Sequence, residues 1–278
     1  MADKIDAKTI RSKVEQINTL PTVPGTLKRI SRTLEKPRIS LDELGKIISN
    51  DPALTTKILK MVNSASYGFP GRISSVSHAT MLLGLNVIKG LLLGVSVFEL
   101  MEKTMTGLWE HSMACAMASR IIAQKKGLKE PEEVSVCGLL HDIGKTILML
   151  QYSEIFQKAM QEAENNGITI YESESRHFSA THAEAGQWLL QKWHFPPTLV
   201  DTIQYHHQPT LSKNSPMETA IVHVADVLVR AKGLGFAGDH VVPELNSAAW
   251  DMVSLSEDDI MEILSDLEDG AQAAREET

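Results

Sequence analysis

The residues of this sequence that are best suited to chemistry are histidines and aspartates that interrupt apolar segments. His141 and Asp142 are adjacent within residues 139–145, inside an otherwise apolar segment of helical pattern. Burying an imidazole beside a carboxylate is costly unless hydrogen bonds or a metal ion satisfy both groups. Adjacent His and Asp can converge on one divalent ion, and the carboxylate of Asp142 can bridge to a second. Lys145 follows His141 by about one helical turn, so we expect its ammonium to face the same pocket and to attract a phosphate, which makes Asp142 and Lys145 the catalytic candidates.

Four further places in the chain hold polar groups in similarly unexpected surroundings, namely His111, His182, the pair His206 and His207, and Asp226. Each alone has an ordinary explanation, because histidines usually satisfy local hydrogen bonds and Asp226 can pair with Arg230 one turn later. Neighbouring helical residues point about 100° apart, so spacing alone favours two different centres for His206 and His207. Together, the order of these residues along the chain indicates metal binding. The other histidines lack such context and are expected to be structural or surface groups: His78, His177, His194, His223 and His240.

Helices must position these side chains, since almost every segment has a helical period. Residues 41–48 carry an apolar stripe behind a capping pair, Ser40 and Glu43, and Asp51 with Pro52 begins another helix. Residues 79–101 form a long apolar stretch whose glycines would let neighbouring helices approach closely. Later helices are expected at about 109–126, 132–150, 153–166, 180–193, 197–206 and 217–232. No alternating strand series occurs in the sequence, so we predict an all-α fold.

Charge divides the 278 residues into three parts. Residues 1–103 hold 15 basic and 9 acidic side chains, residues 104–255 hold 11 and 17, and residues 256–278 hold 1 and 9. The net charge of -8 and the absence of aromatic residues among the basic ones argue against nucleic acid as a partner. The acidic end carries an apolar stripe after Ser256 and Asp259, so we expect a last helix packed on the body, with a detached acidic arm as the alternative.

The sequence also bears on the cellular compartment. Its longest stretch without a charged residue, 73–88, has 16 residues, which is shorter than a membrane span of about 20. The N-terminal residues are polar and unlike a secretory signal. The two cysteines, Cys115 and Cys137, lie in apolar runs and indicate no disulfide scaffold. We therefore expect a cytoplasmic protein without a membrane segment.

The order of the histidines and aspartates resembles that of the HD superfamily of metal-dependent phosphohydrolases. Further segments are similar to those of one branch of it, the HD-related output domain (HDOD) proteins. In the first part of the chain these are residues 20–24, 48–54, 62–68, 73–79 and 83–85. In the second part they are 109–112, 141–142, 182–186, Trp193 and 205–207. The resemblance covers roughly residues 17–235.

The resemblance implies an all-α protein in which an N-terminal helical bundle packs on an HD-like helical domain. We expect these modules at 1–105 and 106–240, followed by an acidic helix or tail at 241–278. It also implies one ion held by His111, His141, Asp142 and Asp226. A second ion would share Asp142 and take His182, His206 and His207. A mixed imidazole and carboxylate set suits iron or manganese, as one or two divalent ions.

The family resemblance implies a regulatory output module in bacterial signal transduction, with signalling proteins or a small phosphorylated ligand as partners. The alternative is a phosphohydrolase or phosphodiesterase acting on a nucleotide or another phosphoester, and a third hypothesis is a protein-interaction scaffold with an empty pocket. Cyclic-di-GMP phosphodiesterases of the superfamily follow their paired histidines with an acidic residue and a Gly-Tyr-Pro loop, which residues 208–216 lack. Relatives with a third metal use a glutamate where this chain has Gly107. Hydrolysis of cyclic-di-GMP is therefore not expected.

Overall fold

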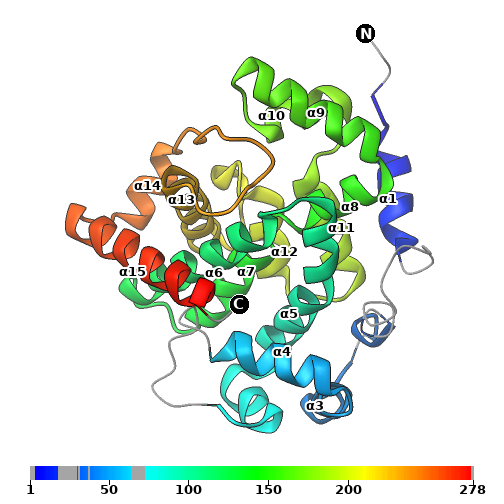
Figure 1. Cartoon of the computed structure of the whole chain (residues 1–278), viewed down its shortest axis with the longest axis vertical. Helices are drawn as coiled ribbons and strands as arrows, with labels where there is room; N and C mark the ends of the chain where they lie inside the picture. Colours follow the sequence, from blue (N-terminus) through cyan, green and yellow to red (C-terminus); the bar gives the residue numbers. More distant parts are fainter. Residues whose placement is uncertain (1–3, 18–29, 31, 37, 64–72, 277–278) are drawn as a thin grey trace.

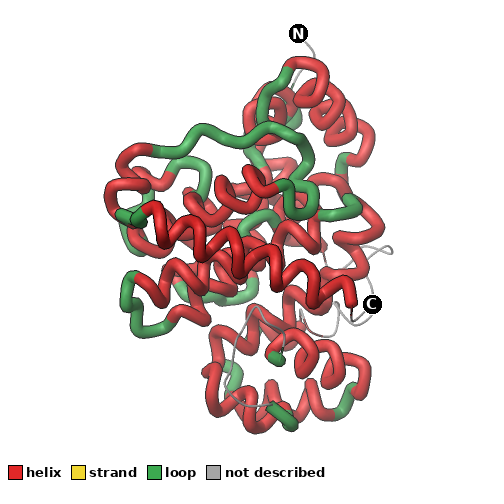
Figure 2. The backbone as a smooth tube through the Cα atoms, turned by 60° about the vertical axis from the view of Figure 1, so that its left-hand side comes forward, coloured by secondary structure: helices red, strands yellow, loops and turns green. Residues whose placement is uncertain are grey.

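The structure is a computed structural model that describes residues 4–17, 30, 32–36, 38–63 and 73–276. Helices account for almost all of its regular structure, and no strand is drawn in the described part of the chain (Figure 2). One isolated bridge, between Ile5 and Phe178, is the exception to this pattern among the described residues. The predicted all-α fold is confirmed. Of the segments that carried the family resemblance, 20–24 and all of 62–68 except its first two residues lie outside the described residues.

A group of helices near the bottom of Figure 1 is formed by α3 (Leu41–Ser49), α4 (Pro52–Val62) and the start of α5 (Val76–Thr104). The expected helix starts are present. The Ser40 hydroxyl accepts a hydrogen bond from the backbone N–H of Glu43, and Asp51 caps α4 through the N–H groups of Ala53 and Leu54. These caps satisfy backbone donors that a helix leaves unpaired at its first turn.

Helix α5 leads from this group into the larger part of the protein. It bends at Gly84, whose φ of 73° and ψ of 175° are not helical. Beyond the bend, α5 packs against α7 (Pro131–Leu140), and a Cβ on Gly90 would clash with the side chain of Val136. The predicted close approach is therefore confirmed at Gly90. Gly84 instead faces open space and permits a bend.

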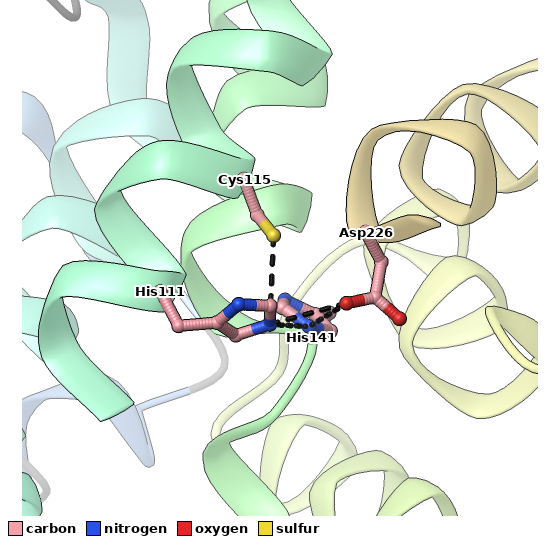
Figure 3. Close-up of side chains that lie close together, drawn as sticks. All are labelled: His111, Cys115, His141 and Asp226. Carbon is pink, nitrogen blue, oxygen red and sulfur yellow. Dashed lines mark hydrogen bonds and ion pairs between the residues drawn. The ribbon is translucent and has the colours of Figure 1, made fainter. Parts of the chain in front are cut away.

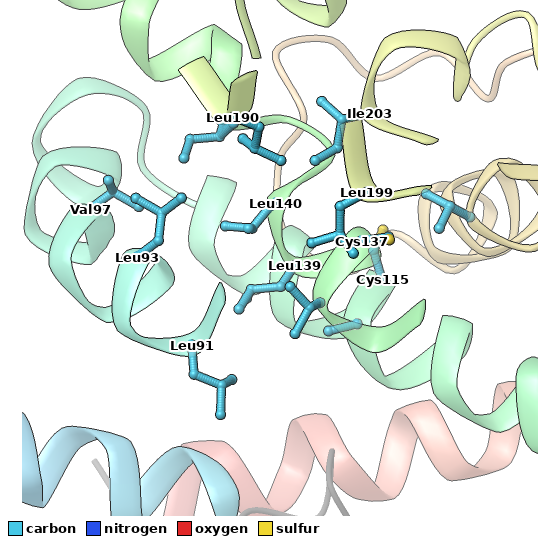
Figure 4. Close-up of a cluster of buried hydrophobic side chains, with 14 of the residues drawn as sticks. Leu91, Leu93, Val97, Cys115, Cys137, Leu139, Leu140, Leu190, Leu199 and Ile203 are labelled. Carbon is cyan, nitrogen blue, oxygen red and sulfur yellow. The ribbon is translucent and has the colours of Figure 1, made fainter. Parts of the chain in front are cut away.

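Helix α5 is, among the described helices, the one long and apolar enough to cross a membrane. However, 71% of its most apolar window is buried inside the protein. Lys89, in the apolar part of α5, is also buried and donates hydrogen bonds to the backbone carbonyls of Trp193 and His194. The neighbouring core residues of α5, α7 and later helices are shown in Figure 4. Helix α5 is thus a buried core helix.

The centre of the larger part is built by α6 (Leu108–Lys125), α7, α8 (Ile143–Gln151), α11 (His182–Lys192), α12 (Pro197–Tyr205) and α13 (Pro216–Lys232). Helix α6 packs against α7 and α13, and α11 packs against α8 and α12. Helices α9 (Ser153–Asn166) and α10 (Ile170–His177) form the upper end in Figure 1. The predicted single helix over 132–150 is wrong, because α7 ends at Leu140, the backbone angles of Asp142 (φ -98°, ψ 8°) are not helical, and α8 begins a new helix.

Both ends of the described chain pack on this larger part. Helix α1 (Ala7–Glu15) lies against α11, and Ile5 exchanges backbone hydrogen bonds with His177 and Ser179 (Figure 1). At the other end, the short helix α14 (Ser247–Val253) precedes α15 (Glu257–Glu276), which packs on α6 and α13. Ile263 and Leu267 are buried there. The predicted packed C-terminal helix is confirmed.

Candidate metal centre

The structure brings all seven predicted ligand residues to one buried region at the break between α7 and α8. His111 lies on α6, and Asp226 lies on α13. His182 is the first residue of α11, while His206 and His207 directly follow α12. Their donor atoms form two groups, and in each group the donor atoms lie within 4.8 Å of one another. Residues from five separate parts of the chain therefore converge through tertiary packing.

The first group contains His111, His141 and Asp226 together with Cys115 (Figure 3). The Nε2 atoms of His111 and His141 are 3.3 Å apart, and the Sγ atom of Cys115 is 3.6 Å from the same His111 nitrogen. Asp226 Oδ1 lies 3.1 Å from His111 Nε2 and 3.9 Å from His141 Nε2. Two imidazole nitrogens, a carboxylate oxygen and a sulfur thus face a common point.

The second group contains Asp142, His182, His206 and His207. His182 Nε2 lies 3.0 Å from His207 Nε2 and 3.4 Å from His206 Nε2. The rings of His206 and His207 have centroids only 4.1 Å apart. The prediction that helical spacing would send these two histidines to different centres is wrong. Both residues lie in the turn that follows α12, and from there both rings reach His182.

Asp142 joins the two groups through its two carboxylate oxygens. Its Oδ2 atom lies 3.3 Å from His141 Nε2 and 3.6 Å from His111 Nε2. Its Oδ1 atom faces the second group, 3.3 Å from His182 Nε2 and 3.9 Å from His206 Nε2. A carboxylate in this position can bridge two cations.

Hydrogen bonds on the far side of three rings orient their Nε2 atoms into the centre. His141 Nδ1 donates to the carbonyl of Gly138 at 2.7 Å, and His206 Nδ1 donates to the carbonyl of Ile203 at 2.7 Å. His182 Nδ1 donates to Oε2 of the buried Glu174 at 2.8 Å. With the proton on Nδ1, each neutral ring presents the lone pair of Nε2 to its neighbours. A hydrogen bond donated by the ring nitrogen that faces away from the metal is typical of histidines that bind metal.

The distances between donor atoms match those expected around one ion. With metal–nitrogen bonds of about 2.0–2.1 Å, two nitrogens lie about 3.3–3.4 Å apart on a tetrahedral ion and about 2.9 Å apart on an octahedral one. The observed Nε2 separations are 3.3 Å for His111 and His141, and 3.4 Å and 3.0 Å in the second group. Among the described residues, Oδ1 of Asp142 and Oδ1 of Asp226 are buried and accept no hydrogen bond. Lone pairs that face one another without a proton or a cation repel, so the residues present fit a metal centre.

Burial and neighbouring charges act on the ionisation of these groups. Burial would raise the pKa of Asp142, but His141 and Lys145 hold it well below its usual value. For His141, burial is outweighed by the nearby Asp142 and Asp226 carboxylates, and its pKa is raised. Burial, reinforced by neighbouring imidazoles, places the pKa values of His206 and His207 well below the usual range. An ionised Asp142 and neutral His206 and His207 are the forms that bind cations.

Lys145 is fully buried beside the centre. Its Nζ atom donates to Asp142 Oδ2 at 2.6 Å and to the carbonyl of Ala237 at 2.8 Å. The ammonium is therefore near the predicted pocket, but it already has two close acceptors. In this arrangement Lys145 balances the charge of Asp142 and holds its carboxylate in place.

Close packing of the backbone at Gly144 brings α8 to the second group. A Cβ at this position would clash with the carbonyl oxygen of His182. Glycine is required here because the start of α11 must lie directly against α8 for His182 to reach Asp142. The sequence Asp142 to Lys145 thus supplies a ligand, a close contact and a counter-charge within one turn.

Two residues of the site were missed by the sequence analysis. Cys115 is four residues after His111, so a His-x-x-x-Cys spacing on one helix face was a usable signal. Glu174 had no such signal, because its contact with His182 depends on the packing of α10 against the start of α11. His223, expected to be structural, uses both ring nitrogens outside the two groups, with the carbonyl of His206 and the N–H of Asn246.

The comparison with known families decides the identity of the chain. The HDOD domain family matches residues 20–209, which is more than half of the 278 residues. The chain belongs to the HDOD domain family. This HDOD chain is 29% identical over 204 residues to a protein from Treponema pallidum, covering 72% of the chain and 40% of that protein. It therefore spans about two fifths of the length of this relative.

Solved structures agree with this assignment. The HDOD chain is similar to an HDOD domain protein from Geobacter sulfurreducens, with a TM-score of 0.68, 27% identity and 97% of each chain covered. It also has the fold of a Marinobacter aquaeolei protein for which a role in signal transduction has been suggested. In that case the TM-score is 0.69 at 19% identity, with 96% of this chain and 64% of the other covered. The second likeness concerns the fold alone.

Proposed function

We propose that this HDOD chain is a regulatory module of bacterial signal transduction whose working state includes a divalent-metal centre of one or two ions. The observation that carries the proposal is the pair of buried donor groups that share the carboxylate of Asp142. The ions would be held by His111, His141, Asp142, His182, His206, His207 and Asp226. In this proposal the metal stabilises the arrangement of α6, α7, α11, α12 and α13, and a signal acts by changing that arrangement.

The closed geometry favours a regulatory role over turnover. The side chains of His111, His141, Asp142, His182, His206 and Asp226 are at most 4% exposed. His207 is the ligand that is partly exposed, and Tyr171 stacks against it with ring centroids 4.3 Å apart. Structural metal sites are closed by protein ligands, whereas catalytic sites keep a position open. A closed centre suits a module that responds to metal or to a ligand bound nearby.

The donor chemistry supports iron or manganese. Imidazole with carboxylate suits first-row ions, whereas calcium prefers a site made of oxygen donors alone. We also propose a cytoplasmic location, since both cysteines of the chain are free and buried. Signalling proteins or a small phosphorylated ligand are the proposed partners. The net charge of -8 supports neither DNA nor RNA.

Metal analysis of protein purified without chelators tests the metal centre. We expect between one and two ions per wild-type chain and a strong loss in the variants His141→Ala and Asp142→Ala. Less than about 0.3 ion per chain, in protein that is folded by circular dichroism, would contradict the proposal, because sites with this many ligands bind tightly. A structural role further predicts that removing the metal lowers the melting temperature, since binding to the folded state alone stabilises it.

A second function, hydrolysis of a nucleotide or another phosphoester, is favoured by the bridging position of Asp142. Two ions that share a carboxylate would activate water and stabilise negative charge on a phosphoryl group. Asp142 would hold the two sites together, and Lys145 would keep its carboxylate ionised. Hydrolysis of a generic aryl phosphodiester by wild type, compared with His141→Ala and Asp142→Ala, tests this function. Equal rates in all three proteins would exclude the enzyme hypothesis for that substrate class.

A further inference from the structure

Cys115 belongs to the first donor group and has no counterpart in the second. It is on α6 one turn after His111, so both side chains project from the same face of the helix. Its Sγ atom is 3.6 Å from His111 Nε2 and within 4.8 Å of the donor atoms of His141 and Asp226 (Figure 3). The side chain is fully buried. Its position therefore brings sulfur to the same point as two imidazoles and a carboxylate.

A buried cysteine is most often an ordinary small core residue, and Cys137 is an example in this chain. Cys137 lies on α7 outside both donor groups. Cys115 differs because an independent feature points to a cation beside it. Asp226 Oδ1 is buried at the same point, and its 3.1 Å contact with His111 Nε2 is not aligned as a hydrogen bond. A cation between the sulfur and this oxygen would satisfy both.

The distances around Cys115 also match coordination. With a metal–sulfur bond of about 2.3 Å and a metal–nitrogen bond of about 2.0–2.1 Å, sulfur and nitrogen on one tetrahedral ion lie about 3.6 Å apart. The observed distance from Cys115 Sγ to His111 Nε2 is 3.6 Å, and the two imidazole nitrogens of the group are 3.3 Å apart. Both distances agree with binding of these atoms to one ion in the first group.

We propose that Cys115 is a thiolate ligand of the first ion, so that the two halves of the centre have different donor chemistry. This inference rests on the proposed metal centre. When a divalent ion binds, the S–H bond of Cys115 breaks, the sulfur lone pair forms the bond to the metal, and the proton passes to the solvent. The first site then offers two nitrogens, one sulfur and two oxygens, from Asp226 and the shared Asp142, while the second offers three nitrogens and the other oxygen of Asp142.

Because the two sites offer different donor atoms, we expect them to prefer different metal ions. Thiolate favours zinc, cobalt and iron over manganese and magnesium, whereas imidazole with carboxylate also accepts manganese. The first site should therefore be the more thiophilic of the two.

Titration of the metal-free protein with Co²⁺ tests the proposal. A thiolate bound to Co²⁺ gives a charge-transfer band in the near ultraviolet, whereas histidine and carboxylate ligands give the weaker visible bands of the ion alone. We expect the near-ultraviolet band in wild type and in Cys137→Ser. We expect it to be absent from Cys115→Ser and Cys115→Ala, which should still show visible bands from the second site. Two different replacements guard against one of them failing to fold, and circular dichroism verifies the fold of each.

The outcomes separate the two proposals. Visible bands without the near-ultraviolet band in wild type would overturn the role of Cys115 and leave the metal centre in place. A near-ultraviolet band that persists in folded Cys115→Ala would also overturn it. Failure of the folded wild type to bind Co²⁺ or any other first-row ion would overturn the metal centre and the role of Cys115 together.

Discussion

The ammonium of Lys145 and the carboxylate of Asp142 form a buried ion pair, with Nζ 2.6 Å from Oδ2. Both side chains are about 1% exposed, and the carbonyl of Ala237 takes a second hydrogen bond from the same ammonium. The pair lies where the two donor groups meet. Its cation therefore offsets the negative charge of Asp142, and the hydrogen bond fixes the direction of the carboxylate that joins the two groups.

Replacing Lys145 with Met should destabilise the metal-free protein by about 3–5 kcal/mol, because it leaves a buried carboxylate without its partner. Bound metal should reduce this loss, since the ion supplies the missing positive charge. Urea unfolding with and without metal measures both effects. Lys125→Met is the control, because Lys125 pairs with Asp259 and Glu262 at the surface, where such pairs contribute little to stability. Equal losses in the two variants would contradict the role of Lys145.

Replacing Asp142 with Asn should reduce the metal content to less than half of the wild-type value, because both halves of the centre share this carboxylate. Metal analysis of folded protein measures the change. Asp201→Asn is a matched control, since Asp201 is also a buried aspartate but bonds to Ser212, Asn214 and Ser215 outside both groups. A metal content in Asp142→Asn equal to that of this control would show that the carboxylate is not a ligand.

Replacing Glu174 with Gln should weaken metal affinity about 10- to 100-fold. Loss of the group that accepts a hydrogen bond from a metal-binding histidine typically has an effect of this size. The carboxylate accepts hydrogen bonds from both Nδ1 and the backbone N–H of His182, each at 2.8 Å. Competition with a chelator measures the affinity. Glu172→Gln on the same helix is the control, because Glu172 belongs to the capping box of α10 and does not contact the site. Unchanged affinity in Glu174→Gln would contradict the orienting role.

Replacing Gly144 with Ala should lower the free energy of unfolding by about 1–3 kcal/mol, because the new methyl group must displace the start of α11. Metal affinity should fall as well, since His182 would move away from Asp142. Gly45→Ala is the opposite control. Gly45 lies inside α3 with open space around it, so Ala should stabilise that helix by about 0.5–1 kcal/mol. Chemical denaturation of Gly144→Ala and of Gly45→Ala measures both changes in the free energy of unfolding.

The contribution of Asp201 to the free energy of unfolding should decrease as the pH becomes acidic. Burial opposes its ionisation, but hydrogen bonds from Ser212, Asn214 and Ser215 outweigh it and lower its pKa below the usual 3.8. A group with a lower pKa in the folded state stabilises above its unfolded pKa, and this contribution is lost as the pH falls through the folded value. The difference in stability between wild type and Asp201→Asn should therefore shrink as the pH is lowered from 5 through the folded pKa of Asp201. A difference that stays constant or grows would contradict the prediction.

The local elements of this protein could be predicted from the sequence, because helical periodicity and capping depend on residues a few positions apart. Ser40 and Asp51 cap the helices that their neighbours predicted, and Ser256 with Asp259 begins α15. The order of histidines and aspartates likewise identified both the family and the seven residues that converge. Such motifs can be read because their residues are unusual in apolar helices.

Only the tertiary structure decided how these residues share the site. The break at His141 and Asp142, the convergence of His206 and His207 and the contact of Glu174 with His182 arise from packing between distant segments. Helical pattern could not show that the chain leaves the helix at the metal motif. Nor could it show that Cys115, an apolar-looking residue, faces the ligands. Side-chain direction at a site built from five parts of the chain depends on helix packing, which local interactions do not determine.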